Sequence, residues 1–225
     1  MLKFEVDPTG EQVFVHVENL VIAGWAGRNQ SSIKEHIREL EEIGVSAPST
    51  TPLFYRVAAD LLTHEKSLQF VGAETSGEVE VVLVGTDQGT LVTLGSDHTD
   101  RHAETFSVAL SKQACAKPIS NRCWWLRDVL EHWDQLKISS SITTAQGSVI
   151  YQDGSLASLL HPEDLLLKFG AERCELPPGL AMYCGTLPVI GRLRSADVFY
   201  LKLDDPVLGR SIEHSYCIDV LPDVS

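Results

Sequence analysis

The stretch Glu78-Val79-Glu80-Val81-Val82-Leu83-Val84 predicts a β-strand that carries two carboxylates. The turn sequence Thr86-Asp87-Gln88-Gly89 follows it, and then a second apolar run, Leu91-Val92-Thr93-Leu94-Gly95. Two such runs joined by a short polar turn predict a β-hairpin. Because side chains alternate between the two faces of a strand, Glu78 and Glu80 lie on the same face. The sequence therefore predicts two neighbouring carboxylates on one face of a hairpin.

The paired glutamates suggest a cation site. Two like charges side by side on a strand are unfavourable unless a positive charge lies between them, and a hard divalent cation prefers oxygen ligands. Asp97, directly after the second run, adds a third carboxylate and leaves coordination positions for water or a chelating substrate. Two alternatives stay open: the glutamates form a solvent-facing polar row, and Asp97 caps a helix that begins near Ala103.

A zinc site is a rival to the carboxylate site. His98 and His102 are four residues apart, which is the spacing of a histidine pair that binds zinc on a helix. No glutamate follows His98 in the metalloprotease arrangement. The sequence therefore favours the carboxylates over the histidines.

Two further segments carry candidate catalytic groups. His36 and Glu39 are three residues apart on a predicted helix over residues 32–43, which has the parts of a general base with an orienting carboxylate. Lys112 follows the apolar residues 108–110, so it can be partly buried and stabilise an anion. The alternatives are a core or boundary histidine in a surface ion pair and an ordinary exposed lysine.

Outside the hairpin, the sequence predicts an α+β, β-rich fold. Short apolar runs are separated by Gly, Pro and Asp, which is typical of a strand-rich core with a few helices. We predict one domain over residues 1–225, in which residues 1–50 can form a lobe or lid. Further strands are predicted over residues 2–6, 12–22, 51–57, 137–142, 147–151, 180–184, 195–203 and 211–220, and further helices over residues 103–114 and 162–169.

Composition excludes several classes of protein. The chain has 225 residues with 31 Asp and Glu against 18 Lys and Arg, a net charge of −13, so it lacks the basic surface of a nucleic-acid or anionic-membrane binder. Its five cysteines contain no Cys-x-x-Cys pair, which argues against structural zinc and for a reducing compartment. No signal peptide or long apolar run is recognisable. We therefore expect a cytoplasmic protein that binds neither nucleic acid nor a membrane.

Taken together, the motifs resemble the fumarylacetoacetate hydrolase superfamily, and specifically an uncharacterised bacterial branch of it known as a domain of unknown function. The resemblance lies in the order of weak motifs between about residues 24 and 220. These motifs are Gly27-Arg28-Asn29, His36-Ile37-Arg38-Glu39, Pro52-Leu53-Phe54-Tyr55-Arg56, Glu78-Val79-Glu80, Asp97-His98-Thr99-Asp100-Arg101, Leu110-Ser111-Lys112, Gly185-Thr186 and Asp197-Val198.

The sequence departs from the family pattern around the substrate. Three extra residues precede His36, Arg56 stands at the place of a lysine, and His102 stands at the place of an aspartate. Leu187-Pro188 follows Gly185-Thr186 in place of the usual glycine-rich continuation. These differences leave the metal motif intact and alter the residues around the substrate.

The resemblance implies a β-roll with a few surface helices, an N-terminal lid helix and a homodimeric assembly. It implies that Mg²⁺ or Mn²⁺ is bound by Glu78, Glu80 and Asp97. The catalytic residues would be His36, Glu39 and Lys112. Substrate contacts would come from Arg28, Arg56, Thr99, Arg101, Gly185 and Thr186.

The implied activity is that of a divalent-metal-dependent hydrolase or decarboxylase. Its substrate would be a small 2-oxo or 1,3-dicarbonyl carboxylic acid, and C–C cleavage would pass through an enolate stabilised by the metal. Two alternatives stay open. One is a metal-dependent lyase or isomerase that acts on sugar-derived 2-oxo acids, and the other is a non-catalytic small-molecule binding module of the same fold.

Overall fold

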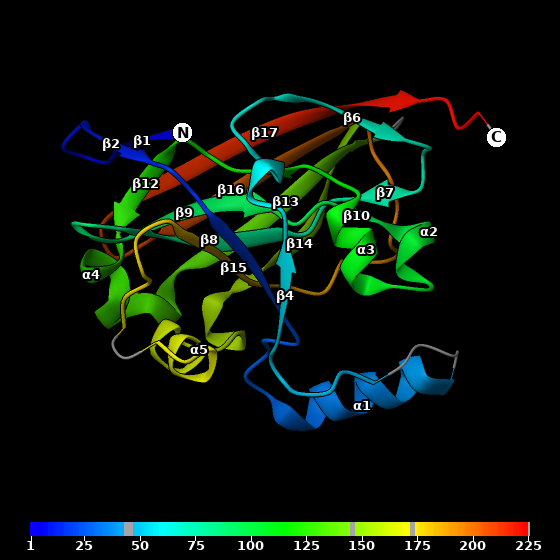
Figure 1. Ribbon diagram of the computed structural model, residues 1–225, viewed down its shortest axis with the longest axis horizontal. Coiled ribbons are helices and arrows are strands. Elements are labelled where there is room, and N and C mark those ends of the chain that lie inside the picture. The colour runs from blue at the N-terminus through cyan, green and yellow to red at the C-terminus, as the bar shows by residue number, and fades with distance from the viewer. Residues whose placement is uncertain (43–46, 145–146, 172–173, 225) are drawn as a thin grey trace.

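The computed structural model places the predicted hairpin in the middle of an eight-stranded sheet (Figure 1). The structure describes residues 1–42, 47–144, 147–171 and 174–224, and it describes the backbone alone at residues 32, 36 and 39–42. The eight strands, in spatial order, are β2 (Glu11–Val15), β1 (Leu2–Val6), β12 (Arg122–Trp125), β9 (Gly89–Ser96), β8 (Val79–Thr86), β15 (Leu180–Thr186), β3 (Asn19–Gly24) and β4 (Leu53–Val57).

A five-stranded sheet packs against the first one. Its strands, in spatial order, are β14 (Gly147–Ser155), β13 (Lys137–Thr144), β16 (Val198–Asp205), β17 (Arg210–Leu221) and β6 (Ser67–Val71). Two short pairs complete the strands, and they are β10 (Thr99–Asp100) with β7 (Thr75–Ser76) and β11 (Lys117–Pro118) with β5 (Leu62–Thr63).

The helices are short and lie around the sheets (Figure 1). They are α1 (Gln30–Glu42), α2 (Arg101–Glu104), α3 (Val108–Gln113), α4 (Leu126–Val129) and α5 (Pro162–Phe169), with 3₁₀ turns at Ala59–Leu61, Leu130–Gln135 and Leu156–Ser158. None of the helices in the described part of the chain is long and apolar enough to cross a membrane.

The core has two parts, because β8 is buried on both faces. Val79, Val81 and Leu83 join the larger hydrophobic cluster, which fills the space between the two sheets. Val82 and Val84 join a smaller cluster, whose side chains come mainly from the eight-stranded sheet itself, so that this sheet curls around it. A strand buried on both faces explains why the apolar run of residues 81–84 is continuous and does not alternate.

Most predicted elements are confirmed, but two of them are divided. The predicted strand 12–22 is two strands, because β2 pairs with β1 whereas β3 pairs in parallel with β15. The predicted helix 103–114 is also divided, into α2 and α3. Ser107 interrupts it with an extended backbone and accepts a hydrogen bond from the amide of Leu110, which starts a new helix.

The first helix begins earlier than predicted. It starts at Gln30, and the side chain of Asn29 accepts a hydrogen bond from the amide of Ser31 at 3.0 Å. Ser32, the first residue of the predicted helix, therefore lies inside the observed one. In Figure 1 the helix lies at the lower edge of the view, on the side where β4 begins.

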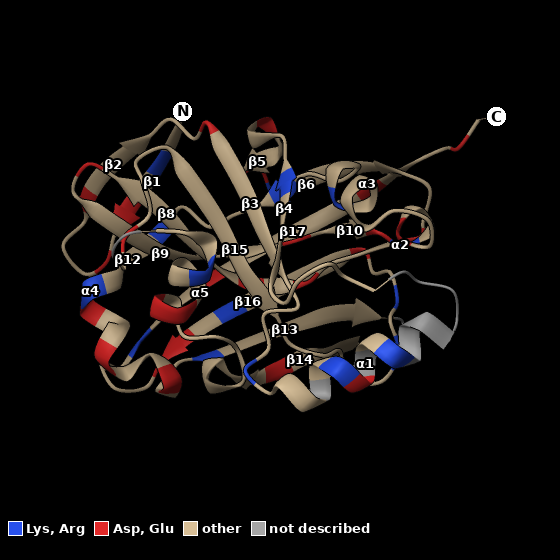
Figure 2. Ribbon diagram, turned by 60° about the horizontal axis from the view of Figure 1, so that its bottom comes forward, with Lys and Arg blue, Asp and Glu red and all other residues tan. Residues whose placement is uncertain are grey.

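Charged residues are spread over many elements. Lys and Arg alternate with Asp and Glu along α1 and recur singly on β1, β4, β16 and α4 (Figure 2). The basic residues do not form a continuous strip in this view.

Candidate metal centre

Three carboxylates meet where the hairpin opens. Glu78 directly precedes β8, Glu80 lies in it, and Asp97 directly follows β9. The hairpin register pairs Val79 with Ser96, and the amide of Asp97 donates to the carbonyl of Glu78 at 2.9 Å. One oxygen from each of the three carboxylates lies within 4.8 Å of the others. The structure therefore brings together the three residues that the sequence predicts as metal ligands.

Burial makes it costly to keep all three carboxylates of this cluster ionised. Glu80 is 2% exposed and Asp97 is fully buried. Burial, together with repulsion from Asp97 and Glu78, raises the pKa of Glu80 well above its usual value. The backbone amide of Gly185 donates to Glu80 at 2.7 Å. An ionised Glu80 therefore needs an additional positive charge nearby.

Two buried lysines balance Asp97. The ammonium group of Lys112 pairs with Oδ2 of Asp97 and lies 3.6 Å from Oε2 of Glu78. The ammonium group of Lys117 lies 3.0 Å from Oδ1 of Asp97 and donates to the carbonyl of His98 at 2.6 Å. Burial favours the neutral acid, but the two ammonium groups outweigh it and lower the pKa of Asp97. Asp97 is therefore held ionised.

Arg101 binds the remaining carboxylate. Its Nη2 donates to Glu78 at 2.9 Å, its Nη1 to Glu104 at 2.8 Å and its Nε to the hydroxyl of Ser76 at 2.7 Å. These bonds engage all three nitrogens of the guanidinium group. Arg101 therefore orients Glu78, and its predicted contact with substrate would have to share these groups.

The donor set fits a hard divalent cation. Carboxylate oxygens are the ligands that Mg²⁺ and Mn²⁺ take, and three of them converge here from two adjacent strands. The raised pKa of Glu80 marks the carboxylate that the three nearby cations balance least. Among the described residues, no second group of three or more His, Cys, Asp or Glu side chains converges in this way.

The rival zinc pair is wrong. His98 is buried, stacked on Phe70 with ring centroids 4.5 Å apart, and its Nδ1 lies 3.0 Å from the hydroxyl of Tyr216. His102 is in α2 with its side chain 76% exposed, 3.9 Å from Glu74. The helix begins only at Arg101, so the helical spacing does not apply to this pair. The alternative that Asp97 caps this helix is also wrong, because Asp100 accepts the bond from the amide of Ala103.

Two arginines predicted to bind substrate are engaged elsewhere. Arg28 forms two bonds of 2.7 Å with Asp134 and donates from Nε to the carbonyl of Leu159 at 3.0 Å. Arg56 is exposed and hydrogen-bonded to Asn19. Because neighbouring side chains on a strand face opposite sides, Arg56 points away from the face of β4 that carries Tyr55.

The other predicted contacts position the ligands. The hydroxyl of Thr99 is buried and donates to the carbonyl of Asp97 at 3.0 Å. The hydroxyl of Thr186 donates to the carbonyl of Val79 at 2.8 Å. Gly185 has a φ of +97°, and a Cβ there would lie 2.9 Å from Cβ of Ala26, so only glycine can present its amide to Glu80 without strain.

The predicted dyad lies in α1. The backbone of His36 and Glu39 is helical, as the spacing requires, but both side chains lie outside the described residues. Their role as base and orienting carboxylate stays a prediction.

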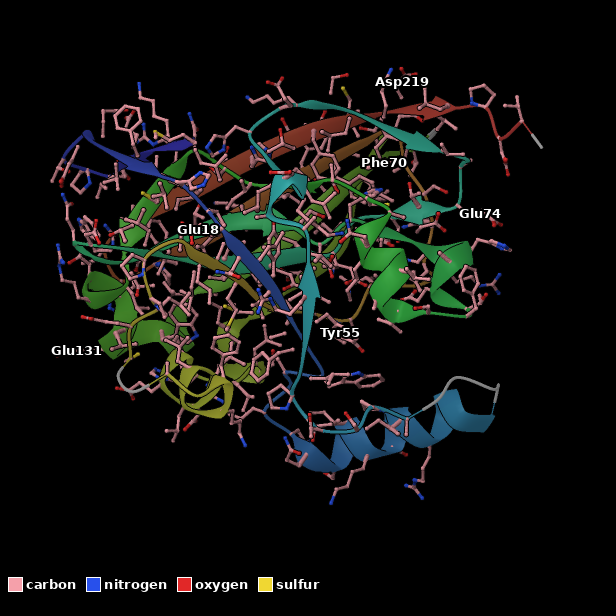
Figure 3. All side chains as sticks on the ribbon, viewed as in Figure 1. Glu18, Tyr55, Phe70, Glu74, Glu131 and Asp219 are labelled. Carbon is pink, nitrogen blue, oxygen red and sulfur yellow. The ribbon has the colours of Figure 1, made fainter. Side chains whose placement is uncertain are left out.

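Lys117 and Tyr55 belong to the site but were not predicted. The ring of Tyr55 is 5.9 Å from the ammonium group of Lys112, and Tyr55 extends from β4 on the side of α3 (Figure 3). A lysine flanked by Ala116 and Pro118 in an apolar stretch is the signal that could have indicated a buried Lys117. For Tyr55, its alternation with Arg56 on a strand could have indicated which of the two faces inward.

Comparison with known proteins adds the family and the fold. Residues 23–216 match the model of a family described as a protein of unknown function, DUF2848. No curated protein matches the sequence.

Several solved structures have the same fold. A protein from Oleispira antarctica, assigned as a fumarylacetoacetate isomerase/hydrolase, has a TM-score of 0.67 at 16% identity, with 97% of this chain and 100% of that chain covered. A protein from Burkholderia cenocepacia, assigned as a fumarylpyruvate hydrolase, has a TM-score of 0.67 at 15% identity, with 98% and 92% covered. The 5-carboxymethyl-2-hydroxymuconate delta-isomerase of Mycobacterium smegmatis has a TM-score of 0.59 at 15% identity, with 94% and 81% covered. At these identities the likeness concerns the fold, and it confirms the predicted β-rich architecture.

Proposed function

The chain belongs to the DUF2848 family, and from its carboxylate cluster we propose that it is a divalent-metal-dependent enzyme acting on a small 2-oxo or 1,3-dicarbonyl carboxylic acid. The proposed reaction is cleavage of a C–C bond, by hydrolysis or decarboxylation, through an enolate. Mg²⁺ or Mn²⁺ is the proposed cofactor, held by Glu78, Glu80 and Asp97.

One observation carries this proposal. Glu80 is a buried carboxylate that faces two other carboxylates, and its only described hydrogen bond comes from one backbone amide. Such a group is costly to keep ionised without a cation, and a divalent cation offers the largest compensating charge. When bound, this cation would act as a Lewis acid toward substrate oxygens.

The chain's own residues would orient the metal-binding carboxylates and stabilise the charge that forms on the substrate. Arg101 and Lys117 hold the carboxylates of Glu78 and Asp97 in place through the bonds described above. Lys112 brings an ammonium group to the carboxylates and to Tyr55, where it can stabilise the negative charge of an enolate. His36, oriented by Glu39, is proposed as the base that takes a proton from water or from a substrate carbon.

The proposal is tested first by metal binding. We expect wild-type protein to bind Mn²⁺ in isothermal titration calorimetry, and we expect Glu80→Gln to lose this binding while the variant stays folded, because an amide keeps the shape without the charge. Glu131→Gln is the matched control, since Glu131 is exposed on the Leu130–Gln135 turn, where Figure 3 labels it. Equal Mn²⁺ affinity in wild type and Glu80→Gln would contradict the proposed site.

Turnover tests the reaction itself. With Mn²⁺ bound, oxaloacetate and an acylpyruvate are the substrates to assay, with product analysis to separate hydrolysis from decarboxylation. Metal binding without turnover of any such acid, and without a change in Mn²⁺ affinity when they are added, would leave the proposed site standing and contradict the proposed substrate class.

A further inference from the structure

Lys112 and a divalent cation would compete for the same oxygens. The ammonium group of Lys112 pairs with Asp97 and lies 3.6 Å from Glu78, and both carboxylates contribute to the proposed metal site. Two positive charges held within a few ångströms of each other in a poorly solvated site repel strongly. Lys112 therefore cannot stay paired with Asp97 while all three carboxylates bind a divalent cation.

Lys117 is placed differently. Its side chain is fully buried, and its ammonium group donates to the backbone carbonyl of His98 as well as pairing with Oδ1 of Asp97. The carbonyl bond does not involve the carboxylate cluster, so it holds Lys117 in place whatever binds there. Lys117 is therefore a fixed counter-ion of Asp97.

Lys112 has a direction in which to move. It is 6% exposed, and it lies within reach of the ring of Tyr55, which is only partly buried. Glu78, its second partner, also reaches the surface, with a side chain 16% exposed. A lysine has a long flexible stem, and an aromatic face can stabilise its ammonium group during such a shift.

From this geometry we infer that Lys112 is an exchangeable counter-ion of the carboxylate cluster. Binding of a divalent cation by Glu78, Glu80 and Asp97 displaces the Lys112 ammonium group, which then faces the open side of the site beside Tyr55 and is available to an anionic substrate. The inference rests on the proposed metal site and assigns an order to it: the cation binds first, and only then is the lysine free for the substrate.

The charges of the site support an exchange over simple addition. Three carboxylates face three cations, Arg101, Lys112 and Lys117, so the cluster is already close to neutral when all are in place. Moving Lys112 away leaves Asp97 still paired with Lys117 and Glu78 still paired with Arg101. The exchange therefore makes room for a cation without leaving either carboxylate unpaired.

The first test compares Mn²⁺ affinities by isothermal titration calorimetry at about pH 8, where free carboxylates are ionised. Lys112→Met removes the competing charge and keeps the length of the side chain, so we expect roughly tenfold tighter Mn²⁺ binding than in wild type. Lys137→Met, which removes an exposed lysine from β13, is the matched control and should leave the affinity unchanged. Affinity in Lys112→Met equal to or weaker than that of wild type would overturn the exchange.

The second test needs no variant. We expect Mn²⁺ to increase several-fold the rate at which Lys112 of the wild-type protein is acylated by a soluble N-hydroxysuccinimide ester, as read by mass spectrometry. Lys117 serves as the internal reference and should stay unlabelled. Labelling of Lys112 that does not change with Mn²⁺ would overturn the exchange, even if Lys112→Met failed to fold.

The two proposals fail differently. If wild type binds Mn²⁺ through Glu80 but neither Lys112 readout moves as expected, the exchange is wrong and the metal site stands. If neither wild type nor Lys112→Met binds Mn²⁺, the proposed function is wrong and the exchange falls with it.

Discussion

At the scale of single residues, the same side-chain chemistry has different consequences in different surroundings. Lys112 and Lys117 both pair with Asp97, yet the pKa of Lys112 is raised whereas that of Lys117 is lowered. Burial lowers both pKa values, but Lys112 also faces the negative charges of Glu78 and Glu80, whereas Lys117 faces the positive charge of Lys112. Neighbouring charges therefore distinguish two residues that are only five positions apart.

His214 gives a prediction about pH. Burial lowers its pKa to about 4, helped by the nearby charges of Lys66 and His64, and its Nε2 has no hydrogen-bond partner among the described residues. The unfolded chain takes up a proton below about pH 6.5 that the folded chain refuses until about pH 4, so the folded state loses stability over this window as the pH falls. Between neutral pH and about pH 5 we expect this residue to cost about 1–2 kcal/mol of unfolding free energy.

The measurement is urea unfolding at both pH values. His214→Phe should lose this part of the pH dependence, and His16→Phe, at an exposed position after β2, should keep it. An identical pH dependence in His214→Phe and wild type would contradict the assignment.

At the scale of elements, the site depends on how strand ends are joined. Glu78 and Asp97 flank the hairpin ends, and Gly185 lies near the end of β15, whose register with β8 shifts before Thr186 pairs with Glu80. This irregularity accompanies the positive φ of Gly185 and lets its amide reach the carboxylate of Glu80. The proposed metal site is therefore built at the ends of sheet strands, whereas the predicted base is on a peripheral helix.

The buried side chain of Gln152, on β14, forms hydrogen bonds to residues of β8, β13 and β15. Its amide nitrogen donates to the hydroxyl of Thr186 at 2.8 Å and to the carbonyl of Leu187 at 2.6 Å, and its oxygen accepts from the amide of Val79 and the hydroxyl of Ser140, each at 3.0 Å. Gln152→Leu would leave several buried polar groups unpaired, so we expect it to lose about 3 kcal/mol of unfolding free energy.

Chemical denaturation provides the comparison. Gln69→Leu removes one exposed hydrogen bond, to Asp219 on the neighbouring strand, and should cost about 0.5 kcal/mol or less. Similar losses in the two variants would show that Gln152 does not link the strands as described.

At the scale of the whole molecule, cation binding should raise the unfolding free energy of the protein. A ligand that binds only the folded state raises its unfolding free energy by about 2.7 kcal/mol at a hundredfold excess over Kd. For a chain of this length we expect a rise in Tm of about 5–10 °C when Mn²⁺ is added to EDTA-treated protein. Oxalate, a mimic of an enolate, should raise Tm further only when Mn²⁺ is present.

A thermal melt followed by circular dichroism measures this directly. Glu80→Gln should show no rise with Mn²⁺, with or without oxalate. A rise of equal size in that variant would place the stabilising cation elsewhere on the molecule. The homodimer implied by the family resemblance stays a prediction, which the same samples can test by analytical ultracentrifugation.

The local pattern of the sequence determined the hairpin, the face shared by Glu78 and Glu80, and most of the strands. Periodicity reports these features because they depend on neighbouring residues. Where local signals compete, the prediction was less accurate: Ser107 divides a helix that the apolar spacing extends through it.

The tertiary structure decided which charged groups meet. Arg28 and Arg56 have the residue types of substrate ligands but pair with Asp134 and Asn19. Lys117, with no motif to mark it, reaches Asp97 from the segment that pairs with Gly95 at the end of β9. Ion pairs between distant segments depend on which strands become neighbours, and that depends on long-range pairing that no local pattern records. The sequence alone therefore determined the three carboxylates, and only the fold determined that Arg101, Lys112 and Lys117 are the cations that balance them.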